Sequence, residues 1–286
     1  MSEGATSREP TDERTAQAFS DSWNRVSGST VYSHEQFLEW FTPLDPGAFE
    51  GRTVVELGFG NGSLLYHFAA FRPARLSGVE LGDTLARTLE NLQHVSPRVL
   101  DLHRGDLTRV HLGEFDLAYC IGVLHHLKDP AAGFQAVLRH TRPGGRFHCW
   151  VYAREGNALI RTTVDPLRRV TSRLPWWLTK HVVALPLVAP YFLWAKALRR
   201  LVRAAPRSRR VLASLPLLDY SLWIAERPFW FFHHVAFDQL VTPETRYFAR
   251  SEVEAWLADP EVDPGTTYLV HRNGNSWKFG GQRRLR

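Results

Sequence analysis

The chain has 286 residues, of which 44% are hydrophobic, and it carries a formal net charge of +6. This length and apolar content suffice for one sizeable core with an elaboration, so we expect one domain with an insert. Only Cys120 and Cys149 occur, both in apolar runs, which argues against a disulfide framework or a cysteine zinc site. They are typical of core thiols in a reducing compartment, and we expect a cytoplasmic protein.

Residues 1–16 are polar, mixed in charge and lack the apolar stretch of a secretory signal, so we expect a disordered tail. Residues 17–49 are predicted to form an N-terminal helical segment, in which Ser33 caps a helix over His34 to Phe41. The simplest role for the large apolar side chains of this segment is to pack on a sheet. They are Phe19, Trp23, Val26, Phe37, Trp40 and Phe41.

A glycine-rich segment follows an apolar run at residues 54–64 and predicts a strand, a tight turn and a helix start. Glycine tolerates positive φ and lets a ligand lie against the backbone. Gly58, Gly60 and Gly62 are spaced G-x-G-x-G with Glu56 before them, unlike the G-x-G-x-x-G of dinucleotide-binding loops. Glu56 would repel a pyrophosphate but attract the ammonium of a methionine moiety. We therefore expect a zwitterionic cofactor. If Glu56 does not have this role, the alternative is a dehydrogenase with the same fold.

Two further apolar runs end in acids. The run at residues 75–80 ends in Glu80, which lies 22 residues beyond Gly58 (80 − 58), where an acid can accept both ribose hydroxyls. The run at residues 99–103 is followed by a Gly-Asp-Leu triplet, and its Asp106 is placed to meet an adenine amino group. These acids favour a nucleoside ligand.

Together with residues 115–120, 122–130 and 138–146, these motifs resemble the class I S-adenosylmethionine-dependent methyltransferases. The later segments look like that family's fourth strand, the next helix, and the Pro-Gly-Gly entry to the fifth strand. The resemblance covers a core at residues 50–152 and implies an α/β fold with a doubly wound, mostly parallel, seven-stranded, Rossmann-like sheet. It also implies S-adenosyl-L-methionine as the cofactor and methyl transfer as the reaction.

The resemblance further implies which residues hold the cofactor. The glycine loop would face the methionine end, Glu80 the ribose, and Asp106 with Leu107 the adenine. A carbonyl at the end of the fourth strand would meet the ammonium, while Phe59 would pack on the cofactor or cover the turn. The implied cofactor-binding residues are Glu56, Gly58, Phe59, Gly60, Asn61, Gly62, Glu80, Leu81, Asp106, Leu107, Cys120, Ile121 and Gly122. In related enzymes an N-terminal helical segment often covers the cofactor, and Tyr32 or Trp40 could take part here.

Residues 153–248 are far more chain than one crossover needs, and we expect a helical insertion between the fifth and sixth strands. From Arg154 to Arg210 there are 13 Lys or Arg and two acids, a local charge of +11 (13 − 2). The segment predicts two or three helices, and Pro175, Pro186 and Pro190 argue against a straight membrane-spanning one. Such an enlarged insertion resembles a bacterial subgroup of the family, which fixes no substrate.

The basic, aromatic insertion has three interpretations. In the first it is a lid whose apolar faces cover a substrate cavity. In the second it makes peripheral contact with a membrane, its tryptophans entering the interface and its arginines meeting anionic headgroups. A nucleic-acid partner is the third and is not favoured, because large aliphatics separate the arginines and no RNA-binding motif accompanies them.

The chain closes with residues 249–286, where a helix at Ser251 to Leu257 precedes two strands at residues 266–270 and 276–280. The turn Asn273-Gly274-Asn275 between the strands predicts a hairpin. These elements complete the sheet implied for the core.

Methyl transfer from a sulfonium is an in-line displacement, so orientation and desolvation dominate and a base is optional. The candidates for the acceptor side are His125 and His126 after the fourth strand, Tyr152 after the fifth, and His234, near Asp238, in the insertion. No metal is expected, because adjacent histidines point in different directions and a third ligand is not evident.

We expect the acceptor to be a small molecule or a lipid-like compound, as in small-molecule biosynthesis. The sequence leaves the acceptor atom and the oligomeric state open. It also leaves open intramolecular alkylation that releases methylthioadenosine, and a non-catalytic S-adenosylmethionine-binding protein.

Overall fold

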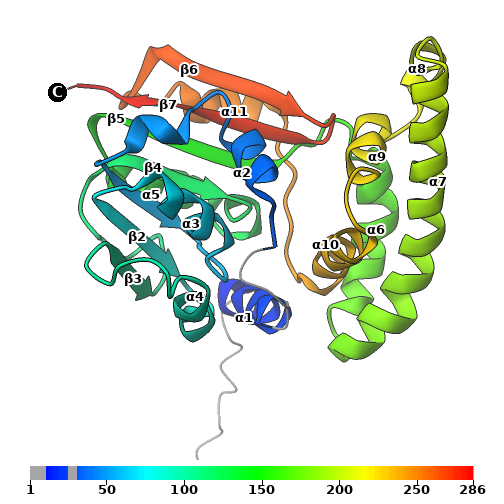
Figure 1. The fold of residues 1–286 in the computed structure, drawn as a ribbon, viewed down its shortest axis with the longest axis horizontal. Helices are drawn as coiled ribbons and strands as arrows, with labels where there is room; N and C mark the ends of the chain where they lie inside the picture. Colours follow the sequence, from blue (N-terminus) through cyan, green and yellow to red (C-terminus); the bar gives the residue numbers. More distant parts are fainter. Residues whose placement is uncertain (1–10, 25–30, 286) are drawn as a thin grey trace, which may run out of the picture.

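The computed structural model describes residues 11–24 and 31–285. These residues form a seven-stranded sheet of order β3-β2-β1-β4-β5-β7-β6 (Figure 1). Strands β1 to β5 run parallel, and β7 runs antiparallel to β5 and β6. The predicted doubly wound, mostly parallel sheet is therefore confirmed. The strands are β1 (Thr53–Leu57), β2 (Arg75–Glu80), β3 (Leu100–Arg104), β4 (Phe115–Ile121), β5 (Thr141–Tyr152), β6 (Val262–Arg272) and β7 (Ser276–Arg283).

Helices cover both faces of this sheet. Because successive strand residues point to opposite faces, Ala118 and Cys120 enter the core on one face, and Leu117 and Tyr119 enter the core on the other. The first core packs on α5 and α11, and the second on α2, α3 and the end of α4. These helices are α2 (His34–Phe41), α3 (Ser63–Phe68), α4 (Leu85–Asn91), α5 (Pro130–His140) and α11 (Arg250–Leu257). Short 3-10 turns lie at η1 (Pro46–Phe49), η2 (Ala69–Phe71) and η3 (Leu124–His126).

The N-terminal segment is helical earlier than expected. Helix α1 spans Thr11–Trp23, so residues 11–16 do not belong to the predicted disordered tail. The reason is packing: α1 lies over Gly82, where an added Cβ would be 2.1 Å from Ser20 Oγ. The capped helix at His34 is confirmed, with Ser33 Oγ accepting from Gln36 N at 3.2 Å. The prediction for Val26 lies outside the described residues.

The insertion after β5 consists of helices that stand beside the carboxyl ends of the parallel strands, with α7 outermost (Figure 1). They are α6 (Ala158–Thr171), the π-helical segment η4 (Leu178–Ala184), α7 (Leu185–Ala204), α8 (Ser208–Val211), the turn η5 (Leu212–Ser214), α9 (Leu218–Ile224) and α10 (Phe229–Val241).

The prolines do not end the long insertion helix. Segment η4 continues into α7, giving a helix over Leu178–Ala204 of 27 residues with a mean hydropathy of 1.4. Pro186 lies in the first turn of α7, where a missing N–H is tolerated, and Pro190 is accommodated further along. Among the described residues this helix is long and apolar enough to cross a membrane. That is weak evidence of a span, because core helices of soluble proteins pass the same test.

Candidate active site

The glycine loop leaves the carboxyl end of β1 in a conformation that only glycine adopts easily. Gly58, Gly60 and Gly62 have φ of 86°, 55° and 77°. A Cβ on Gly58 would lie 2.4 Å from Val123, and one on Gly62 would lie 2.6 Å from Thr88. Beside Gly60 there is open space, since an added Cβ would meet nothing within 4 Å. The loop therefore offers a bare backbone edge to a ligand.

Carboxylates end the two neighbouring strands, as expected. Glu80 accepts from the backbone N–H of Gly60 at 3.0 Å and of Gly82 at 2.8 Å, so it holds the loop against β2. Asp106 accepts from the N–H and the hydroxyl of Thr108 at 2.8 and 2.7 Å. Both acids line the cavity described below. Because each carboxylate has about four acceptor directions, each retains capacity for ligand hydroxyl or amino groups.

Glu56 lies beneath the loop and is 2% exposed. Burial raises the pKa of its carboxyl to about 8, with a smaller contribution from the charge of Glu80, although the hydrogen bond from Tyr119 opposes the shift. The Tyr119 hydroxyl donates to Glu56 Oε2 at 3.0 Å. Glu56 is thus largely protonated at neutral pH in the free protein, and a neighbouring ammonium would favour its ionisation.

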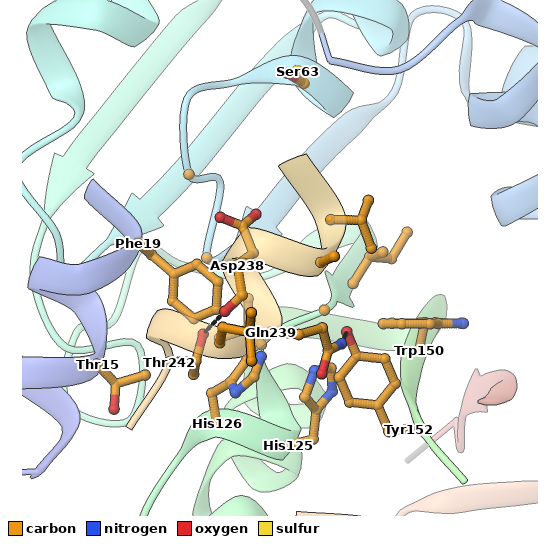
Figure 2. A pocket seen from close by; sticks show the side chains of 18 of the residues that line it. Thr15, Phe19, Ser63, His125, His126, Trp150, Tyr152, Asp238, Gln239 and Thr242 are labelled. Atoms are coloured by element: carbon orange, nitrogen blue, oxygen red, sulfur yellow. Dashed lines mark hydrogen bonds between the residues drawn. The ribbon is translucent and has the colours of Figure 1, made fainter. Parts of the chain in front are cut away.

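A cavity of about 490 Å³ runs from the glycine loop to the insertion helices. Figure 2 shows part of its wall, with Thr15 and Phe19 of α1, His125 and His126 after β4, Trp150 and Tyr152 of β5, Asp238 and Gln239 of α10, and Thr242 directly after α10. Helices α6 and α7 add apolar side chains. The loop and the insertion therefore share one cavity.

The predicted cofactor-binding residues line this cavity, with two exceptions. Gly62 begins α3 and turns toward Thr88, away from the cavity. Cys120 is fully buried in the core under the sheet, and the next residue, Ile121, faces the cavity instead because strand residues alternate. The ring of Phe59 packs against β2, where a Cβ added to Gly78 would lie 2.6 Å from it, and Phe59 also lines the cavity.

The two adjacent histidines are buried at the cavity, 1% and 8% exposed for His125 and His126. His126 Nδ1 lies 2.8 Å from the carbonyl of Glu244, which only accepts, so Nδ1 carries the proton and Nε2 has the free lone pair. Burial lowers the pKa of His126 to about 3 and that of His125 well below its usual value. Both rings are therefore neutral at physiological pH.

Unpaired polar atoms also mark the cavity wall. His125 Nδ1 and Asn61 Nδ2 are buried without a hydrogen-bond partner among the residues that the structure describes. A buried donor or acceptor without a partner is costly, and sites that bind ligands are where such atoms are found. Asn61 belongs to the part of the cavity predicted to hold the cofactor, and His125 to the part predicted to hold the acceptor.

Tyr152 lies beside the histidines, its ring 4.2 Å from that of His125. Its hydroxyl accepts a hydrogen bond from Gln239 Nε2 of α10 (Figure 2), and burial raises the pKa of Tyr152 well above its usual value. Tyr152 is therefore a neutral phenol. Sequence reasoning missed Gln239, which no local motif indicates, and Trp150, whose place two residues before Tyr152 on the same face of β5 could have revealed it.

His234, the fourth predicted catalytic residue, does not line the cavity. It is buried in α10 with its Nε2 3.4 Å from Asp238 Oδ2, one helical turn away. Asp238 is the cavity-lining member of the pair. His234 therefore lies behind Asp238, because residues four apart on a helix are neighbours.

The residues present fit S-adenosylmethionine. The bare glycine loop leaves room for its methionine moiety. The acids that follow β2 and β3 suit its nucleoside, and the buried Glu56 suits its ammonium. In the described ranges, no group of three or more His, Cys, Asp or Glu could hold a metal ion.

The sheet order with an antiparallel β7 and the glycine loop after β1 is the topology of the class I methyltransferase fold. Residues 55–149 match the family described as "Methyltransferase domain". S-adenosylmethionine is the cofactor of this class.

The chain spans only part of the length of the proteins that it resembles. The chain is 36% identical over 114 residues to an uncharacterised protein of Synechococcus sp., covering 38% of this chain and 27% of that protein. It is 30% identical over 118 residues to the ubiquinone biosynthesis O-methyltransferase of Thiobacillus denitrificans, covering 40% of this chain and 48% of that enzyme. The aligned part is thus less than half of either relative. The fold is similar to an O-methyltransferase family protein from Burkholderia thailandensis, with a TM-score of 0.52, 12% identity and coverage of 88% of this chain and 56% of that chain.

Proposed function

We propose that this protein transfers a methyl group from S-adenosylmethionine to a small-molecule or lipid-like acceptor held under the helical insertion. The observation that carries the proposal is the single cavity that joins the glycine loop to His125, His126 and Tyr152 and continues between α6, α7 and α10. A cofactor and an acceptor bound in one largely apolar cavity would meet with little water between them. In this proposal the insertion acts as a lid.

The chain's own residues would hold the cofactor through complementary groups. Glu80 would accept from the ribose hydroxyls, and Asp106 with Leu107 would hold the adenine. The Ile121 carbonyl and the Glu56 carboxylate would lie on the side of the amino group. The bound cofactor supplies the electrophilic methyl group.

On the acceptor side, His126 is the best-placed proton acceptor. The Glu244 carbonyl fixes its tautomer, so Nε2 can take a proton from an acceptor hydroxyl as that oxygen becomes the nucleophile. Its low pKa makes it a weak base, and orientation by Tyr152, Trp150 and the histidine rings would contribute more. The relative named for ubiquinone biosynthesis acts as an O-methyltransferase by its name, which supports a hydroxyl acceptor here.

The test is product analysis. The purified protein is incubated with S-adenosylmethionine and fractions of a bacterial small-molecule and lipid extract, and the nucleoside is identified by mass. Formation of S-adenosylhomocysteine that depends on one fraction supports methyl transfer and starts identification of the acceptor. Methylthioadenosine would instead assign intramolecular alkylation, and an unchanged cofactor in every fraction would favour a non-catalytic binding protein.

A further inference from the structure

The outward side of the long insertion helix exposes many large apolar side chains. Leu193 is 70% exposed, Leu187 55% and Trp194 41%. We call this surface the α7 outer face, and α7 is the insertion helix farthest from the sheet (Figure 1). Its large apolar residues are Trp176, Trp177, Val182, Leu185, Leu187, Leu193, Trp194 and Leu201. Leu187, Trp194 and Leu201 recur every seven residues and so lie along one side of the helix, and exposed apolar side chains gathered in this way mark an interaction site.

Positive charge without matching acids lies at both ends of this face. Residues 166–218 contain 11 Lys or Arg and no Asp or Glu, and residues 181–195 contain no Lys or Arg. Three of these arginines reach acids from outside the segment: Arg168, Arg199 and Arg209. Six others are exposed and have no acid within 4 Å among the described residues. These are Arg169 and Arg173 at one end, and Arg200, Arg203, Arg207 and Arg210 at the other.

The opposite side of α7 is bound to the protein, so the helix cannot be surrounded by lipid while the insertion stays folded. Val188, Phe192 and Ala195 pack in a buried cluster with residues of α9 and α10. Arg199 pairs with Glu226 at 2.7 Å on the side toward α9. A helix with one face packed on the protein and the other apolar and flanked by arginines suits a position in the interface plane.

The cavity reaches this same surface. Leu187 of α7 and Leu159 of α6 both line the cavity, yet they are 55% and 41% exposed. The rim of the cavity is therefore apolar and continuous with the α7 outer face.

From this arrangement we propose that the α7 outer face binds an anionic bilayer surface. The apolar side chains enter the boundary between headgroups and acyl chains, and the six unpaired arginines meet the headgroup phosphates. Unneutralised arginine at both ends of an apolar helix face complements such a surface better than it complements a neutral protein surface. A lipid-soluble acceptor would then reach the cavity through its rim, a consequence that rests on the proposed function.

The test is flotation of the full chain with vesicles, without cofactor or acceptor. Phosphatidylcholine vesicles are compared with vesicles containing 30% phosphatidylglycerol, at low salt and at 0.5 M salt. We expect recovery with the anionic vesicles at low salt, and less at high salt because exposed charges are screened. Recovery that is equal on both vesicle types, or absent from both, overturns the proposal.

A matched pair of variants tests the apolar part. Leu193→Asp should weaken partitioning by about tenfold or more, since a leucine side chain no longer enters the interface. Leu89→Asp is the control, because Leu89 is 49% exposed on α4, away from the insertion. Equal loss in both variants, or none in Leu193→Asp, contradicts the proposal.

A second pair of variants tests the arginines, and both members of the pair have the same total charge. The double variant Arg200→Gln, Arg203→Gln should lose about fivefold in partitioning for each arginine. The control Arg52→Gln, Arg98→Gln removes the same charge from exposed positions elsewhere and should change partitioning much less. Equal effects would show that only net charge matters, which overturns the assignment of the arginines.

Other occupants give different results. Light scattering that detects a dimer abolished by Leu193→Asp, with no vesicle recovery, would assign the face to a second copy of the chain. Tight binding of an RNA oligonucleotide that depends on Arg200 and Arg203, again with no vesicle recovery, would assign it to nucleic acid. Either result overturns the proposal, and neither bears on methyl transfer, which product analysis tests separately.

Discussion

Glu56→Gln should make the free protein more stable at neutral pH. Burial raises the pKa of Glu56 from 4.5 to about 8, so between these values the folded chain binds a proton that the unfolded chain does not. The free energy of unfolding therefore falls as pH rises from 4.5 and levels off above 8. At pH 7 the cost is (7 − 4.5) × ~1.4, or about 3–4 kcal/mol. Glutamine is neutral, similar in shape and able to accept the Tyr119 hydrogen bond, so it avoids this cost.

The same substitution should weaken cofactor binding. Wild-type Glu56 would release its proton to face the ammonium of S-adenosylmethionine. The affinity of the wild-type protein for the cofactor should therefore rise between pH 6 and pH 8 more steeply than that of Glu56→Gln. The comparison cancels titration of the cofactor's own amino group, which is common to both proteins. Calorimetry in two buffers of different ionisation enthalpy measures the released proton directly.

Denaturant unfolding of both proteins from pH 4.5 to pH 8 is the assay for stability. We expect similar free energies of unfolding near pH 4.5 and a gap that grows to about 3–4 kcal/mol at pH 7. A gap that does not depend on pH, or a variant less stable at pH 7, would mean that Glu56 is already ionised in the free protein. An identical pH dependence of cofactor affinity in both proteins would refute the contact with the ammonium.

Three further substitutions test the site. Glu80→Ala should weaken S-adenosylmethionine binding by about 10-fold to 100-fold in calorimetry, because it removes charge-assisted hydrogen bonds to ligand and loop; unchanged affinity would reject the ribose assignment. Gly58→Ala should lower stability by about 1–3 kcal/mol in thermal unfolding, and by more than Gly113→Ala, which has positive φ but no neighbour within 4 Å. His126→Gln should reduce turnover of the identified acceptor by about 100-fold at unchanged cofactor affinity, whereas His234→Gln should change turnover much less; the reverse order would move the acceptor site to α10.

Local chemistry made the sheet and the loop predictable from the sequence. The run ending in Glu80 matches β2, which spans Arg75–Glu80, and the serine before His34 caps α2. Both depend on residues near in sequence: apolar runs punctuated by glycine, and a hydroxyl that satisfies an exposed N–H. The glycine spacing likewise follows from a backbone conformation that other residues resist.

Long-range packing decided what the sequence could not predict. Helix α1 closes the cavity because Phe19 meets His126, with ring centroids 4.9 Å apart, a contact that no local pattern announces. Gln239 reaches Tyr152 only because α10 packs over the strand ends. The misplacement of Cys120 was avoidable, since alternation along β4 places it on the face opposite to Ile121.

A cavity shaped for S-adenosylmethionine should distinguish it from NADH, and calorimetric titration of the purified chain with each ligand in turn measures this. We expect saturable one-to-one binding of S-adenosylmethionine that Glu80→Ala weakens, and no binding of NADH. Tight binding of NADH, or no binding of S-adenosylmethionine, would contradict this expectation.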